Sequence, residues 1–172
     1  VGLLRRFRDS IENEWPRAIE IEEHSHSAMA NAYEAGAAGL PCAIFRGYKG
    51  AELKRVNSNI KSINCPFTGE ELAAVPSLKP DLAFIHAQKA DEKGNVLIEG
   101  ILGVQKEAVL SAKRSVVTVE EIVKKLDTHP NATILPDWTV GAICKVPGGA
   151  HPSYTRGYYT RDNASYLEWD KI

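Results

Sequence analysis

The sequence predicts an α/β protein with an open, mostly parallel sheet. Short apolar or alternating segments, typical of strands, are separated almost throughout the chain by segments with helical periodicity. This alternation favours parallel strands joined by helical crossovers. The apolar run at 82–87 (LAFIHA) is typical of a strand covered on both faces. With 172 residues the chain fits one domain, expected at 1–172, with an irregular tyrosine-rich segment at 150–172.

The N-terminal part is expected to begin with an amphipathic helix, because apolar residues recur there at helical spacing until the pattern stops near Pro16. A strand is expected at 18–23, where isoleucine and glutamate alternate. A helix rich in small residues follows at 27–38, with Ser27 as its N-terminal cap and Gly39 at its end.

The next part is expected to hold a short buried strand at 42–45, a polar loop with one helical turn at 46–59 and an alternating strand at 60–65. Thr68 and Glu71 have the spacing of a capping box, which predicts that TGEELAAV is a helix.

After the run LAFIHA, the polar turn DEKGN predicts a hairpin whose second strand is VLIEG, at 96–100. Helices are expected at 103–114 and 120–126, on either side of a β-branched strand at 115–119. Two further strands are expected at 131–136 and 140–149.

Charge and composition exclude several classes of protein. The 21 basic and 22 acidic residues give a net charge of −1, so no basic excess is present to bind nucleic-acid phosphates. No apolar run approaches the ~20 residues that a membrane-spanning helix needs. The three cysteines, Cys42, Cys65 and Cys144, are widely spaced, which favours reduced thiols in a cytoplasmic protein over a disulfide framework or a zinc site.

Carboxylates gather at the end of the expected strand 18–23. Glu22 and Glu23 would lie near its C-terminal end, on opposite faces. In open α/β sheets ligands bind outside the carboxyl ends of strands, so a carboxylate there could act as a nucleophile toward a thioester or as a general base toward water. The alternative is a solvated acidic edge. His24 and His26 have no third ligand nearby, so no metal site is expected.

Cations follow the expected strand 42–45. Arg46 comes directly after it, where a guanidinium could hold a substrate carboxylate through two parallel hydrogen bonds. Loop cations such as Lys49 can attract the phosphates of a nucleotide-bearing substrate. The alternative is ordinary solubilising charge on a surface loop.

Two further groups of residues are candidates for binding. His86 lies inside an apolar run, so a core histidine is the alternative to a ligand-binding one, and Gln88 follows where its amide could orient a carbonyl. Gly148 and Gly149 end the expected strand 140–149, and without side chains they let a ligand or a neighbouring chain approach the backbone closely. The alternative for the two glycines is a simple turn.

Long collinear segments resemble the A (alpha) subunit of the heteromeric family I CoA-transferases, the glutaconate CoA-transferase group. They are GLPCAIFRG, PFTGEELAAVP, PDLAFIHAQKADEKGNVLIEG, QKEAVLSAKRSVVTVEEIV and GGAHPSYTRGYYTRDNASYLEWD. The resemblance implies the CoA-transferase (NagB/RpiA-like) fold, here lacking the N-terminal part that the family carries upstream. It also implies a hetero-oligomer with a B-type (beta) subunit, and coenzyme A as part of an acyl-CoA substrate with no permanently bound cofactor. Lys49, His86, Gln88, Gly148 and Gly149 are then the expected residues for binding it.

The segments IEIEEHSH, FRGYKG and YYTRDNASYLEWD resemble most closely the branch of hydrolases that open the last ring of steroid-derived CoA thioesters. That resemblance implies a water-activating glutamate on the alpha chain, expected at Glu23 and next at Glu22, with Arg46 orienting the substrate. CoA transfer between carboxylic acids, in which a glutamate of the B-type partner is the nucleophile, stays open as an alternative. So does a non-catalytic A-type domain that binds a partner or a small acid.

Overall fold

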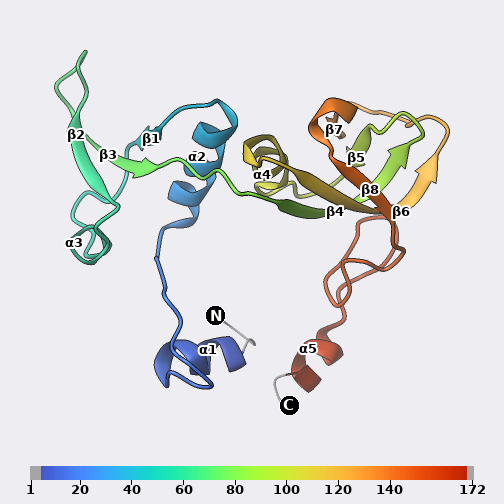
Figure 1. Ribbon diagram of the computed structural model, residues 1–172, viewed down its shortest axis with the longest axis horizontal. Coiled ribbons are helices and arrows are strands. Elements are labelled where there is room, and N and C mark those ends of the chain that lie inside the picture. The colour runs from blue at the N-terminus through green and yellow to red at the C-terminus, as the bar shows by residue number, and fades with distance from the viewer. Residues whose placement is uncertain (1–4, 170–172) are drawn as a thin grey trace. The chain divides into compact units, whose positions relative to one another are not determined.

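The computed structural model describes residues 5–169, which form two compact units (Figure 1). The larger unit runs from Glu23 to Gly149 and contains both sheets. The smaller unit joins the residues up to Glu22 with those from Ala150 onward. The irregular C-terminal segment expected from the sequence therefore associates with the start of the chain.

A mixed five-stranded sheet dominates the larger unit, with strand order β7-β5-β4-β6-β8. Strands β4, β6 and β8 are parallel, whereas β5 is antiparallel to β4 and β7 is antiparallel to β5, so four of the five strands run in one direction. The α/β class with a mostly parallel sheet is thus confirmed. The strands are β4 (Ala83–Asp91), β5 (Val96–Ile98), β6 (Ser115–Val123), β7 (Thr133–Leu135) and β8 (Ala142–Lys145).

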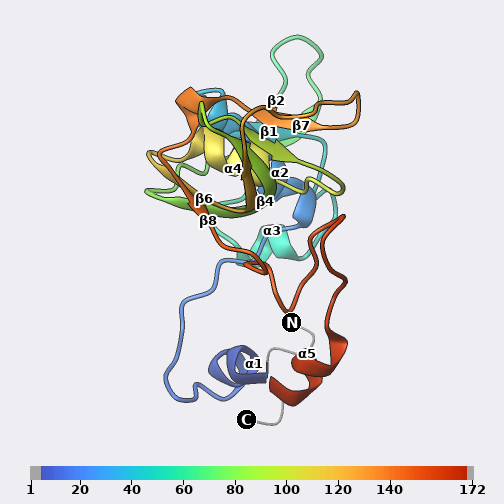
Figure 2. The same ribbon diagram turned by 90° about the vertical axis from the view of Figure 1, so that its right-hand side faces the viewer.

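Helix α4 (Gln105–Ser111) forms the crossover from β5 to β6 and packs beside β4, as Figure 2 shows. Its Val109 enters the main core with Val117 and Val119 of β6 and Leu135 of β7, all nearly inaccessible to solvent. Burying each such side chain stabilises the fold by about 1.5–3 kcal/mol. A single turn of 3-10 helix, Asp137–Thr139, leads from β7 to β8.

A second, antiparallel sheet has the order β1-β3-β2 and packs with α2 around its own apolar cluster. In α2, a Cβ on Gly36 would clash with the backbone oxygen of Leu78, so only glycine permits this approach. The elements are α2 (His26–Ala37), β1 (Cys42–Phe45), α3 (Leu53–Val56), β2 (Lys61–Asn64) and β3 (Glu71–Pro76).

The strand expected at 18–23 is wrong, because the backbone there has no regular structure and pairs with no other strand. Half of Ile21 is exposed, so the isoleucine–glutamate alternation does not mark a buried face. The expected cap of α2 is also wrong. Ser25 is the N-cap, and its Oγ accepts a hydrogen bond from the N–H of Ala28 at 3.2 Å.

Two expected helices are strands. TGEELAAV supplies β3, because pairing with β1 on one side and β2 on the other satisfies its backbone groups. The expected helix at 120–126 gives way to β6, which continues to Val123 alongside β4. In both segments tertiary pairing overrides local helix propensity.

In the smaller unit, α1 spans Arg5–Glu12, while the Leu3 and Leu4 of the expected N-terminal helix lie outside the described residues. The C-terminal segment is irregular up to a short helix, α5 (Asn163–Trp169). Nowhere in the described part of the chain is a helix both long and apolar enough to span a membrane.

Candidate functional site

His86 meets a buried carboxylate that was not expected from the sequence. Its Nε2 lies 2.6 Å from Oε1 of Glu120, and its Nδ1 lies 2.8 Å from Oγ1 of Thr118. His86 pairs in register with Thr118, and Glu120 lies two residues further along β6, so all three side chains share one face of the sheet. Both ring nitrogens are thereby engaged, and His86 fixes β4 to β6.

The same carboxylate holds the loop that follows β8. Its Oε2 accepts a hydrogen bond from the backbone N–H of Gly148 at 2.8 Å, and the side chain is only 4% exposed. A Cβ on Gly149 would lie 2.7 Å from Nδ1 of His86. Gly149 therefore packs against the histidine ring of its own chain, whereas the approach of a ligand or a neighbouring chain to the two glycines stays a prediction.

Sequence reasoning missed Glu120 because it placed EEIVKKL in a helix. The available signal was the strand pattern of SVVTV, which would bring Glu120 onto the face of Thr118 if continued by two residues. We call His86, Thr118, Glu120, Gly148 and Gly149 the strand-end cluster, because it forms where β8 ends.

Gln88 serves the backbone of a different loop. Its side-chain amide donates to the backbone oxygen of Glu99 at 3.1 Å and accepts from the N–H of the same residue at 2.9 Å. The Oε1 of Glu99 in turn lies 2.6 Å from Nε2 of His129. Gln88 is 5% exposed, and its amide orients a peptide group after β5.

Glu22 and Glu23 lie in irregular backbone with both residues exposed, since the strand that should present them does not form. They also fall on opposite sides of the division between the two units. The backbone oxygen of Glu23 accepts a hydrogen bond from Nδ2 of Asn57 at 2.8 Å, which ties this residue to the segment after α3.

Arg46 binds a carboxylate of its own chain. Its Nε donates to Oε1 of Glu70 at 2.9 Å and its second guanidinium nitrogen donates to Oε2 at 2.8 Å, which is the bidentate geometry expected for a substrate. These hydrogen bonds raise the pKa of Arg46 and, with the smaller effect of the nearby Lys49, lower the pKa of Glu70. The positive charge of Arg46 is therefore already paired.

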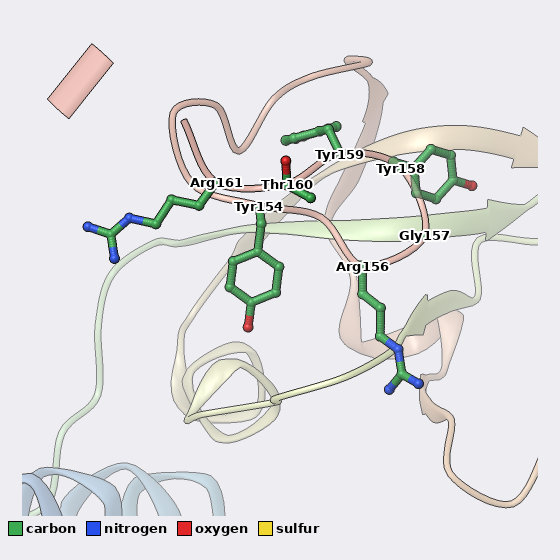
Figure 3. A pocket seen from close by; sticks show the side chains of 7 residues that line it. All are labelled: Tyr154, Arg156, Gly157, Tyr158, Tyr159, Thr160 and Arg161. Atoms are coloured by element: carbon green, nitrogen blue, oxygen red, sulfur yellow. The ribbon is translucent and has the colours of Figure 1, made fainter. Parts of the chain in front are cut away.

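A hollow of about 460 Å³ lies in the C-terminal segment of the smaller unit (Figure 3). We call it the Tyr–Arg pocket. Its lining consists of Tyr154, Arg156, Gly157, Tyr158, Tyr159, Thr160 and Arg161. Within the described residues, no group of three or more histidine, cysteine, aspartate or glutamate side chains is arranged to hold a metal ion.

Comparison with known proteins separates the two expected branches. Over its full length the chain is 63% identical to the A-type subunit of 3-oxoadipate CoA-transferase from Pseudomonas knackmussii, and it covers 61% of that protein. It is 30% identical, over 84% of its length, to the cholesterol ring-cleaving hydrolase IpdA subunit of Mycobacterium tuberculosis, of which it covers 53%. The expected closer likeness to the steroid-ring hydrolases is therefore wrong.

Structural comparison supports the same family. Glutaconate coenzyme A-transferase from Acidaminococcus fermentans superposes with a TM-score of 0.85 at 32% identity, and the match covers 98% of this chain and 58% of that one. The chain thus spans 53–61% of the length of these relatives. Residues 6–145 match the family described as Coenzyme A transferase. The sheet topology and these matches together show that the chain belongs to the coenzyme A transferase family.

Proposed function

We propose that this chain is part of the A-type subunit of a two-subunit enzyme that transfers coenzyme A between carboxylic acids, one of them a dicarboxylic acid of the 3-oxoadipate kind. The observation that carries this proposal is the 63% identity to the corresponding subunit of a 3-oxoadipate CoA-transferase, which extends over all 172 residues. Identity at this level, unbroken along the chain, supports a shared substrate class as well as a shared fold.

The contacts within the strand-end cluster support a nucleophile on the partner. Both ring nitrogens of His86 are engaged within the strand-end cluster, and Glu120 is buried between His86 and Gly148. Neither side chain is presented to a substrate. A glutamate of the B-type subunit would then attack the acyl carbonyl and expel the coenzyme A thiolate, which would attack the resulting anhydride at the glutamyl carbonyl and release the first acid. The second carboxylic acid would attack this glutamyl thioester, and the same steps in reverse would form the new acyl-CoA and free the glutamate.

Hydrolytic ring opening of a cyclic CoA thioester is the second candidate. It is favoured by the 30% identity to the cholesterol ring-cleaving hydrolase subunit and by the exposed Glu22 and Glu23, either of which could activate water. It ranks second because the identity to the transferase subunit is 63%.

The test is co-expression of the intact A-type protein with a B-type subunit from the same source, followed by assays with 3-oxoadipate as acceptor and a panel of acyl-CoA donors. We expect a stable complex that forms 3-oxoadipyl-CoA without net release of coenzyme A. The variants Glu22→Gln and Glu23→Gln should retain this transfer.

Other outcomes would contradict the proposal. Hydrolytic opening of a cyclic, ketone-bearing acyl-CoA, with coenzyme A still attached to the product and the reaction lost in Glu22→Gln or Glu23→Gln, would establish the hydrolase instead. An A-type protein that forms no complex with the B-type subunit and turns over no acyl-CoA would establish the non-catalytic binding domain.

A further inference from the structure

The Tyr–Arg pocket combines aromatic walls with a cation that has no ion-pair partner among the described residues. Tyr154, Tyr158 and Tyr159 belong to its lining, and Arg156 stands at the tip of the hairpin that forms it. Figure 3 shows the side chains of Tyr154 and Arg156 extending to the same side of this hairpin. A volume of about 460 Å³ falls within the range of small-molecule sites.

Hydrogen bonds within the segment hold the hairpin in shape. Thr155 and Tyr159 form a bridge, and the hydroxyl of Tyr159 accepts from Oγ1 of Thr155 at 2.8 Å and from the N–H of Ala150 at 2.9 Å. The N–H of Tyr158 donates to the oxygen of Thr155 at 3.0 Å, which closes a turn around Arg156 and Gly157. Gly157 has a φ of +87°, a conformation that favours glycine in such a turn.

The charge of Arg156 is not neutralised by the described part of the chain, where no carboxylate forms an ion pair with it. The nearest acidic residue in sequence, Asp162, is committed elsewhere. It accepts hydrogen bonds from the N–H and hydroxyl of Ser165 and from His151, and these lower its pKa to about 2. Arg161, on the other side of the pocket, stacks over Tyr166 with 4.6 Å between the guanidinium carbon and the ring centre.

We propose that the Tyr–Arg pocket binds a small oxyanion carried on an apolar body, with Arg156 holding the oxyanion and the tyrosine rings contacting the body. A planar guanidinium matches a carboxylate through two parallel hydrogen bonds, as Arg46 does with Glu70 in the same chain. Resting on the proposed function, the ligand is the remote carboxylate of a dicarboxylic acyl group, and Arg156 sets the preference for dicarboxylic over monocarboxylic acids.

The direct test is calorimetric binding to the intact protein without partner or turnover. The probes are adipate, hexanamide as the uncharged analogue with the same six-carbon chain, and adenosine 3′,5′-bisphosphate as the phosphate-bearing end of coenzyme A, all at one ionic strength. We expect adipate to bind more tightly than hexanamide. Arg156→Gln should weaken adipate binding about tenfold, the size of one lost charge-assisted interaction. Arg156→Lys should restore part of it.

A matched control is Arg114→Gln, which removes an exposed arginine from the larger unit and should leave binding unchanged. Equal binding of adipate and hexanamide, or adipate binding that survives Arg156→Gln, would overturn the proposal. The remaining outcome is that adenosine 3′,5′-bisphosphate binds more tightly than adipate and loses this binding in Arg156→Gln. That outcome would overturn the carboxylate assignment and assign the pocket to a phosphate of coenzyme A.

Turnover in the two-subunit complex separates this inference from the proposed function. If both hold, Arg156→Gln raises KM for 3-oxoadipate and leaves KM for a monocarboxylic acceptor unchanged. An active transferase whose KM for 3-oxoadipate does not respond to Arg156→Gln rejects the pocket assignment alone. A complex without transfer activity, combined with Arg156-dependent adipate binding, rejects the transferase and retains the binding site.

Discussion

The Nε2 of His86 lies 2.6 Å from Oε1 of Glu120, across two parallel strands and 34 positions apart in the chain. The other oxygen of the carboxylate accepts from Gly148 in the loop after β8. One buried glutamate therefore links three segments: β4, β6 and the turn that leaves the sheet. A carboxylate this deeply buried is tolerated because its partners are in place.

Removing the carboxylate should destabilise the fold strongly. Glu120→Ala leaves His86 and the Gly148 N–H without their acceptor, and we expect a loss of about 3 kcal/mol in the free energy of unfolding, measured by urea titration. Glu92→Gln, at an exposed turn residue, is the control and should stay within about 0.5 kcal/mol of the wild type. Equal effects of the two substitutions would show that the cluster carries no stability.

Gly149 should tolerate no side chain while His86 is present. A Cβ there would meet Nδ1 and Cε1 of the ring at 2.7 and 2.8 Å, and we expect Gly149→Ala to cost about 1–3 kcal/mol through overpacking. The pair His86→Ala and Gly149→Ala should be less destabilising than the sum of the two single changes, because removing the ring removes the clash. Strictly additive free energies of unfolding would contradict this contact.

The cap of α2 can be tested with two neighbouring serines. Ser25→Ala should cost about 1 kcal/mol in the free energy of unfolding, because the Ser25 hydroxyl satisfies the otherwise free N–H of Ala28. Ser27→Ala should cost clearly less, since Ser27 lies inside the helix. The opposite ranking would restore the cap expected from the sequence.

An element of the fold was predictable from the sequence when the contacts that form it lie between residues close together in the chain. The hairpin from β4 to β5 was predictable because its turn is self-contained: the carboxylate of Asp91 accepts from the backbone N–H groups of Lys93 and Asn95, and Gly94 has a φ of +96°. Strand β3 was not predictable from its own residues, because its helix-favouring alanines are held extended by two flanking strands.

The candidate site also combines residues that local sequence could indicate with a contact that it could not. His86, Gly148 and Gly149 could be singled out one at a time, from an unusual histidine and a glycine pair. Their connection depends on Glu120, whose position requires that β6 continue beside β4, and this is a contact between distant parts of the chain. The pairing of Arg46 with Glu70 was hidden for a related reason, since Glu70 was placed in a helix that does not exist.

The pair formed by Arg46 and Glu70 should make stability depend on pH on the acid side. The pKa of Glu70 is lower in the folded protein than the ordinary value of 4.5, so its contribution is present above that value and lost as pH falls through the lowered pKa. Arg46→Gln should return the pKa of Glu70 toward 4.5, observable by NMR titration of the carboxyl group. An unchanged titration in Arg46→Gln, matching that in Arg114→Gln, would show that the ion pair does not form in solution.

Gln88 should hold the peptide group of Glu99 in place, so its loss should destabilise the backbone at Glu99. Gln88→Glu keeps an acceptor for the Glu99 N–H but presents a carboxylate oxygen to the Glu99 carbonyl in place of the amide donor, whereas Gln88→Ala removes both hydrogen bonds. Since each buried peptide group left unpaired costs about 1–3 kcal/mol, both variants should be destabilised. Hydrogen exchange at the Glu99 amide should accelerate in Gln88→Ala, while the amide of Val117 in the core of β6 serves as the internal reference. If hydrogen exchange accelerates equally at both amides, the protein has lost stability globally, and Gln88 does not stabilise this loop locally.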